Sequence, residues 1–136
     1  MTGLDTNVLV RYIVQDDAEQ SLAATALIEG GEKVGETFFI NQIVLCEVVW
    51  VVTRCYSAGR DEIGRLIEQI LRTASFRVQR SEEAWSALNI YRKTPADFAD
   101  CLIACGNRAA DCRETATLDR QAAQTAGFRL VSSLRD

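Results

Sequence analysis

The spacing of apolar residues predicts a chain in which short strands alternate with longer helices. Apolar residues recur at helical intervals from Val8 to Ile13, from Asp17 to Glu29, from Asp61 to Thr73 and from Ser81 to Tyr91. Compact apolar runs predict strands, a very short one at Leu4 and others at residues 37–40, 76–78, 114–118 and 128–131. This alternation predicts an α/β fold with a mostly parallel sheet.

Several segment ends follow from local residue preferences. The pair Gly30-Gly31 predicts the end of the second helix. Residues 43–56 are ambiguous, because their β-branched side chains favour a strand while their length and spacing favour a helix. Thr94 and Pro95 predict the start of a helix, with Asp97 placed as a capping-box acid. A further helix is predicted over residues 121–125.

The composition indicates one soluble globular domain. The chain has 136 residues, of which 48% are apolar and 25% charged, enough for a substantial core, so a single domain is expected over residues 1–136. The early acid Asp5 leaves no room for a secretory signal, and the apolar run at residues 43–52 is too short to span a bilayer. We expect a cytoplasmic protein without a membrane partner.

The chain has five cysteines and no histidine. An odd number without paired close spacings argues against a disulfide framework. Cys101 and Cys105 lie one helical turn apart, where small residues packing a helix are favoured over a zinc site. The lack of histidine excludes Ser-His-Asp and Cys-His catalysis and imidazole ligands. Any metal would therefore be held by carboxylates, which favour hard cations such as Mg²⁺ or Mn²⁺.

The net charge of −4 argues against broad electrostatic binding of nucleic acid, but it does not exclude an enzyme that acts on nucleic acid. Four arginines, Arg54, Arg60, Arg65 and Arg72, cluster along the chain. They fit a local phosphate-contacting face and a solvated helix surface equally well.

Four acids lie in apolar surroundings and are the candidate catalytic and metal-binding residues: Asp5, Glu47, Asp100 and Asp119. Asp5 and Asp119 each follow a predicted strand, where parallel α/β sheets bind ligands. Each also has an ordinary interpretation as a helix cap. Glu47 and Asp100 are harder to explain, because a carboxylate among apolar residues must reach solvent or a partner.

Carboxylates gathered in one pocket raise one another's pKa unless a cation intervenes, and a divalent ion would resolve this repulsion. Such a site suits phosphodiester hydrolysis. Three polar neighbours, Thr6, Asn7 and Thr117, are placed to orient the acids or a water molecule.

Four segments resemble PIN-domain ribonucleases, and in particular the VapC toxins of bacterial type II toxin–antitoxin pairs. The matching segments are residues 4–12, 44–51, 96–104 and 117–120, in the family's order. The chain departs from the family at Leu118, where phenylalanine is common. It departs again at Ala110-Asp111-Cys112, where a Gly-Cys turn is usual and a different turn shape is expected.

The resemblance implies a three-layer α/β/α sandwich of the PIN type, a homodimer, and Mg²⁺- or Mn²⁺-dependent endonucleolytic cleavage of RNA. By position, Asp5, Glu47, Asp100 and Asp119 correspond to the family's acidic quartet, with Asp97 as an accessory acid. It also implies a cognate antitoxin that occludes the site, and operator DNA bound only through that antitoxin.

Three other functions are less well supported by the sequence than a PIN-type ribonuclease. A haloacid-dehalogenase-like phosphatase needs an acid two residues after Asp5, where this chain has Asn7. A phospho-receiver domain needs a lysine on a late strand, and none follows Lys93. A catalytically silent PIN-fold interaction domain would have no reason to keep four unpaired carboxylates.

Overall fold

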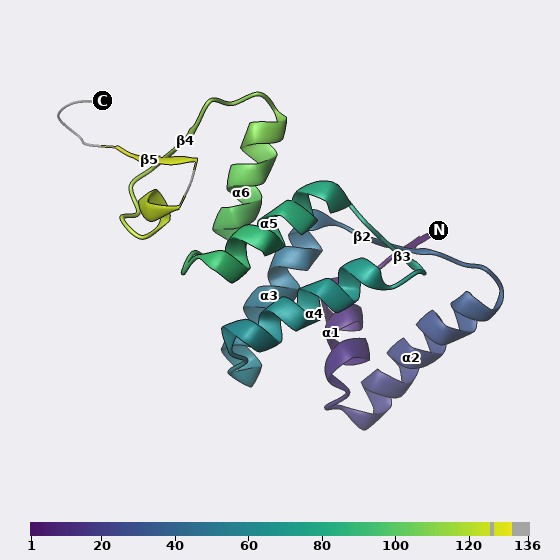
Figure 1. The fold of residues 1–136 in the computed structure, drawn as a ribbon. Helices are drawn as coiled ribbons and strands as arrows, with labels where there is room; N and C mark the ends of the chain where they lie inside the picture. The colour runs from purple at the N-terminus through teal and green to yellow at the C-terminus, as the bar shows by residue number, and fades with distance from the viewer. Residues whose placement is uncertain (126, 132–136) are drawn as a thin grey trace. The chain divides into compact units, whose positions relative to one another are not determined.

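The computed structural model describes residues 1–125 and 127–131. Helices and parallel strands alternate along these residues, as the α/β prediction requires (Figure 1). The chain divides into two compact units, residues 1–81 and residues 82–136. The expectation of one domain over residues 1–136 stays a prediction.

The first unit contains a parallel sheet with strand order β1-β2-β3. Its strands are β1 (Thr2–Gly3), β2 (Phe38–Ile40) and β3 (Phe76–Val78). Phe38 pairs with Thr2 on one side and with Phe76 on the other. The predicted strands at residues 37–40 and 76–78 are therefore confirmed, and so is their parallel pairing.

Four helices belong to this unit: α1 (Thr6–Val14), α2 (Ala18–Lys33), α3 (Gln42–Tyr56) and α4 (Arg60–Arg72). α1 packs against α2 and α3, while α4 packs against α3 and β3. The most deeply buried apolar side chains come from all of these elements, and they include Leu9, Ile28, Phe38, Ile40, Leu45, Ile63 and Ile67. Burial of this apolar surface is the main stabilising contribution to the unit.

The ambiguous segment is a helix, α3, from Gln42 to Tyr56. Its buried residues Leu45, Val48 and Val52 recur at intervals of three and four, so helical packing prevails over the β preference of its branched residues. Asn41 caps the helix, because its side chain accepts a hydrogen bond from the Ile43 backbone N–H at 2.7 Å.

The predicted helix end at Gly30-Gly31 is wrong. α2 continues through both glycines to Lys33, and the chain turns at Gly35, which has a φ of 79°. Gly31 has a packing role instead: a Cβ there would lie 2.6 Å from the Phe38 ring. A glycine can therefore remain within a helix where a neighbouring aromatic ring approaches its backbone.

The second unit contains most of α5 (Ser81–Lys93), with α6 (Phe98–Ala109) and the parallel pair β4 (Thr115–Thr117) and β5 (Phe128–Leu130). Tyr91 and Phe98 join the end of α5 to the start of α6 through an edge-to-face ring contact. The predicted helix over residues 121–125 is only a short 3₁₀ turn, η1 (Ala122–Gln124).

The predicted start of the Asp100 helix at Thr94 and Pro95 is also wrong. α6 begins at Phe98 with Asp97 in the N-cap position. The Thr94 hydroxyl donates instead to the Ile90 carbonyl at 2.9 Å, at the end of α5. Pro95 therefore lies in the link between the two helices.

The cysteines of α6 have the packing role favoured from the sequence. Cys101 and Cys105 are both buried, whereas Cys55 and Cys112 are exposed. Across residues 1–125 and 127–131, no helix combines the length and the apolar composition that a bilayer-spanning segment needs.

Candidate active site

Asp5 lies where β1 gives way to α1. It is the N-cap residue of α1, and its Oδ1 accepts a hydrogen bond from the Thr6 backbone N–H at 2.8 Å. The N-cap interpretation is therefore confirmed, and the partial positive charge of the helix N-terminus stabilises the carboxylate. Capping leaves the side chain exposed, so the same residue remains available for a ligand.

Glu47 is connected to this corner by one hydrogen bond. The Thr6 hydroxyl donates to Glu47 Oε1 at 2.7 Å across 41 positions of sequence. A carboxylate among apolar residues must reach solvent or a hydrogen-bond partner, and Glu47 does both, since it is solvent-exposed and bonded to Thr6. Thr6 thus links Glu47 to Asp5, and its role in orienting the acids at a metal site stays a prediction.

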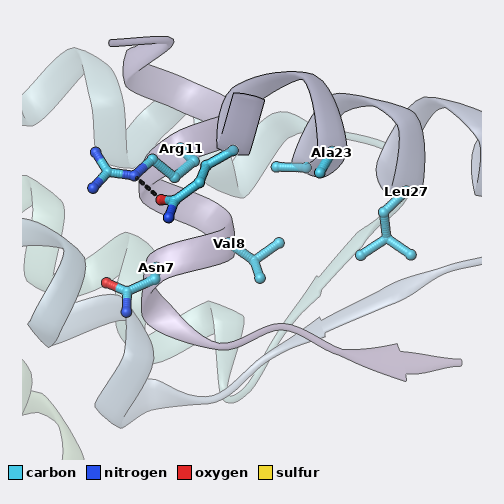
Figure 2. Close-up of a pocket in the computed structure, with 7 residues that line it drawn as sticks. Asn7, Val8, Arg11, Ala23 and Leu27 are labelled. Atoms are coloured by element: carbon cyan, nitrogen blue, oxygen red, sulfur yellow. Dashed lines mark hydrogen bonds between the residues drawn. The ribbon is translucent and has the colours of Figure 1, made fainter. Parts of the chain in front are cut away.

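Asn7 does not make this contact. It lines a cavity of about 380 Å³ between α1 and α2, together with residues such as Val8 and Leu27 (Figure 2). Arg11 lines the same cavity and donates from Nε to Gln20 Oε1 at 2.8 Å. The predicted supporting role of Asn7 at the acids stays a prediction.

Asp97 and Asp100 lie at the start of α6. Asp97 is exposed, and its side chain makes no capping hydrogen bond, so the capping-box interpretation is wrong. Asp100 is half-buried in the first turn of the helix. Burial raises the pKa of Asp100, and the negative charges of Asp97 and Asp119 raise it further.

Asp119 lies two residues beyond the end of β4. Its Oδ1 accepts a hydrogen bond from the Gln121 backbone N–H at 2.8 Å, and the Thr117 hydroxyl accepts one from the Asp119 backbone N–H at 3.0 Å. Gln121 also donates from Nε2 to the Pro95 carbonyl at 3.1 Å, which ties this turn to the segment before α6. These bonds explain why Asp119 influences Asp100.

The structure therefore places the predicted acids in two groups. Asp5 and Glu47 lie in the first unit, while Asp100 and Asp119 lie in the second with Asp97. Within each unit, the described residues contain no set of three Cys, Asp or Glu side chains arranged to hold one ion. The convergence of all four acids on a metal stays a prediction.

The chemistry of the donors fits a hard cation. All the candidate ligands are carboxylates, and none of the four forms an ion pair within the part of the chain that the structure describes. Burial and the charges of Asp97 and Asp119 raise the pKa of Asp100, as they do for a carboxylate with no cation beside it. Oxygen donors with uncompensated charge are the ligands that Mg²⁺ and Mn²⁺ prefer.

One exposed feature was not predicted from the sequence. Trp50 lies on α3 three residues after Glu47 and is 58% exposed, and the Arg54 guanidinium lies over its ring at 5.4 Å. Trp50 belongs to an apolar run of the sequence, which predicts a buried core residue. Only the assignment of the segment as a helix places it on the face of Glu47.

The comparison with known families identifies the class of protein. The sequence model of the PIN domain matches residues 4–128, which span both compact units. The chain therefore belongs to the PIN-domain family. This membership confirms the predicted α/β fold of the PIN type.

A curated relative makes the resemblance more specific. The chain is 26% identical over 132 residues to the VapC ribonuclease of Aquifex aeolicus (strain VF5), and the match covers 97% of this chain and 96% of that protein. The resemblance to VapC proteins is thus confirmed along nearly the whole sequence.

Proposed function

We propose that this chain is a divalent-metal-dependent endoribonuclease and the toxin of a toxin–antitoxin pair. The observation that carries the proposal is the nearly full-length similarity to a protein named VapC ribonuclease. The four acids support it, because none of them forms an ion pair in the described part of the chain. Asp5 and Asp119 lie just beyond parallel strands, where α/β folds bind ligands.

In this proposal Asp5, Glu47, Asp100 and Asp119 hold the ion, which is Mg²⁺ or, alternatively, Mn²⁺. When bound, the ion polarises a phosphoryl oxygen and lowers the pKa of a coordinated water. The donor chemistry of the four acids is the observation that fits such an ion.

The surrounding residues position these acids. Thr6 fixes one oxygen of Glu47, and Thr117 accepts from the backbone of Asp119. Asp100 is ionised at a cost, because burial and the charges of Asp97 and Asp119 raise its pKa. A cation bound nearby would offset the free-energy cost of ionising Asp100, which supports a cation site at this position.

The substrate of the proposed enzyme is RNA, and its protein partner is a cognate antitoxin that occludes the site. We also propose a homodimer in the cytoplasm that contacts operator DNA only through the antitoxin. These partners follow from the similarity to VapC proteins.

The test is cleavage of total cellular RNA by the purified protein, freed of any antitoxin. We expect discrete fragments with Mg²⁺ or Mn²⁺ and none with a chelator. Asp5→Asn is expected to abolish cleavage, because it removes a charged ligand while an amide oxygen can still cap α1. Its melting temperature should stay close to that of the unsubstituted protein.

The matched control is Asp61→Asn, which changes an exposed acid in the first turn of α4. It should cleave as the unsubstituted protein does. Fragments that persist in Asp5→Asn would indicate a contaminating nuclease. Absence of both cleavage and metal binding would reject the proposal and favour a silent PIN-fold interaction domain.

A further inference from the structure

Trp50 and Arg54 form an exposed pair on α3 that the proposed metal site does not use. More than half of the Trp50 surface is in contact with solvent. The Arg54 guanidinium lies over the indole ring at 5.4 Å from its centre, the geometry of a cation–π contact. The pair thus presents an aromatic surface next to a positive charge.

The pair continues the face of α3 that carries Glu47. Residues three and four apart lie on one side of a helix, so Glu47, Trp50 and Arg54 follow one another along it. At about 1.5 Å per residue, Trp50 lies about 4.5 Å and Arg54 about 10 Å farther along the axis than Glu47. Ile43, one turn before Glu47, is also exposed.

We propose that Trp50 and Arg54 bind single-stranded RNA beside Glu47: the indole stacks on a base and the guanidinium contacts a phosphate. This inference rests on the proposed ribonuclease activity. Stacking on an aromatic side chain accepts any base, and arginine adds attraction for the backbone. In a chain with a net charge of −4, such attraction must come from a local cation.

The pairing of a ring with a cation is the feature that favours RNA. Tryptophan and arginine are both common at protein interfaces as well, but the exposed carboxylate of Glu47 beside them is of a type depleted there. A basic side chain next to an aromatic ring matches the alternation of phosphate and base in a single strand. A protein partner at this face is the competing outcome of the test.

Binding is measured by the anisotropy of a short fluorescent single-stranded RNA in chelator, so that cleavage cannot interfere. We expect Trp50→Ala to weaken binding about tenfold or more, and Trp50→Phe to retain most of the affinity. Arg54→Gln should lower the slope of log affinity against log salt by about 0.7. Leu22→Ala, which removes another exposed apolar side chain on α2, should bind normally.

The inference is overturned if Trp50→Ala binds RNA as tightly as the unsubstituted protein, or if the latter binds none. It is also overturned if Trp50→Ala leaves the RNA affinity unchanged and alters only the oligomeric mass of the protein in solution. This face would then be a protein interface. Cleavage assays separate the two proposals. If the Trp50→Ala variant cleaves RNA with an unchanged KM, only the inference about Trp50 and Arg54 is contradicted. If the unsubstituted protein does not cleave RNA, the proposed ribonuclease activity itself is contradicted.

Discussion

At the residue scale, Thr6 is the side chain that links two of the candidate acids. Its backbone N–H donates to Asp5, and its hydroxyl donates to Glu47. Thr6 is buried, so both of its donor groups lie at the edge of the core, while the two acceptor carboxylates stay exposed. The residue thus couples the start of α1 to the middle of α3.

Replacing Thr6 tests this coupling. Thr6→Val keeps the shape of the side chain but removes the hydroxyl, so Glu47 loses its bond. We expect a loss of about 10- to 100-fold in metal affinity or RNA cleavage. Thr6→Ser keeps a hydroxyl and should retain most of the metal affinity and cleavage activity. Metal titration and cleavage rates of the two variants give the comparison, and equal activity of both variants would contradict the role.

Asp5 and Asp119 were predictable from local sequence as acids at strand ends, and so was the capping bond of Asp5, whereas the contact of Glu47 was not. Asp5 follows an apolar residue and precedes a helical pattern, which is enough to predict a residue at the end of a strand. The bond between Thr6 and Glu47 spans 41 positions, so no local pattern contains it. The exposure of Trp50 depends in the same way on packing between distant elements.

At the element scale, the turn after α6 places an aspartate in a conformation that usually favours glycine. Asp111 has a φ of 69°, the left-handed conformation that usually favours glycine. The Cys112 N–H donates to the Asn107 carbonyl at 2.9 Å, and the Asp111 N–H donates to the Arg108 carbonyl at 3.0 Å. This is a Schellman ending, so Asp111 takes the position that a glycine would occupy.

This turn predicts a change in stability. Asp111→Gly should raise the free energy of unfolding by about 0.5 kcal/mol, because relief of the left-handed strain exceeds the added flexibility of the unfolded chain. Asp111→Ala should lower it, since alanine adopts the left-handed conformation less readily than aspartate. Urea denaturation of the three proteins gives the order, and a less stable glycine variant would contradict the strain.

Helix ends were predicted less well than helix interiors, for physical reasons. α2 continues through Gly30 and Gly31, and at Gly31 a glycine is needed because Phe38 of β2 packs where a Cβ would be. α6 begins later than expected because Thr94 bonds back to α5. In both cases the contact with a neighbouring element gives the residue a different role from the one its local preference predicts.

At the scale of the whole molecule, stability should depend on pH and on metal through Asp100. Burial raises the pKa of Asp100 above its ordinary 3.8, with Asp97 and Asp119 adding to the effect. A raised pKa in the folded state favours the protonated form. The corresponding stability is complete below the ordinary pKa and is lost as pH rises through the raised value.

We therefore expect Asp100→Asn to melt at a higher temperature than the unsubstituted protein at pH 7 in chelator, with the difference vanishing below pH 3.8. Mg²⁺ should raise the melting temperature of the unsubstituted protein more than that of the variant, because an ion that binds only the native state stabilises it. Melting scans across pH, with Asp61→Asn as control, measure both effects. Identical curves for Asp100→Asn and the unsubstituted protein would show that Asp100 carries no such charge penalty.

The α/β class and most elements followed from periodicity, since β2, β3, β4, β5 and the helices were expected close to where they occur. The fold class is encoded locally because each element must bury one apolar face. The convergence of the four acids was inferred from their apolar surroundings, and the family resemblance added their correspondence to an acidic quartet. It depends on contacts across the chain and stays a prediction.

The division of the chain has a consequence for the order of events on the ribosome. All strands of the sheet β1-β2-β3 have been synthesised once Val78 has left the exit tunnel, and amino-terminal regions generally fold first. Asp5 and Glu47 have then emerged, while Asp100 and Asp119 have not. Any activity that needs both pairs can begin only after residue 119 has also left the tunnel, which delays it until the rest of the protein has been made.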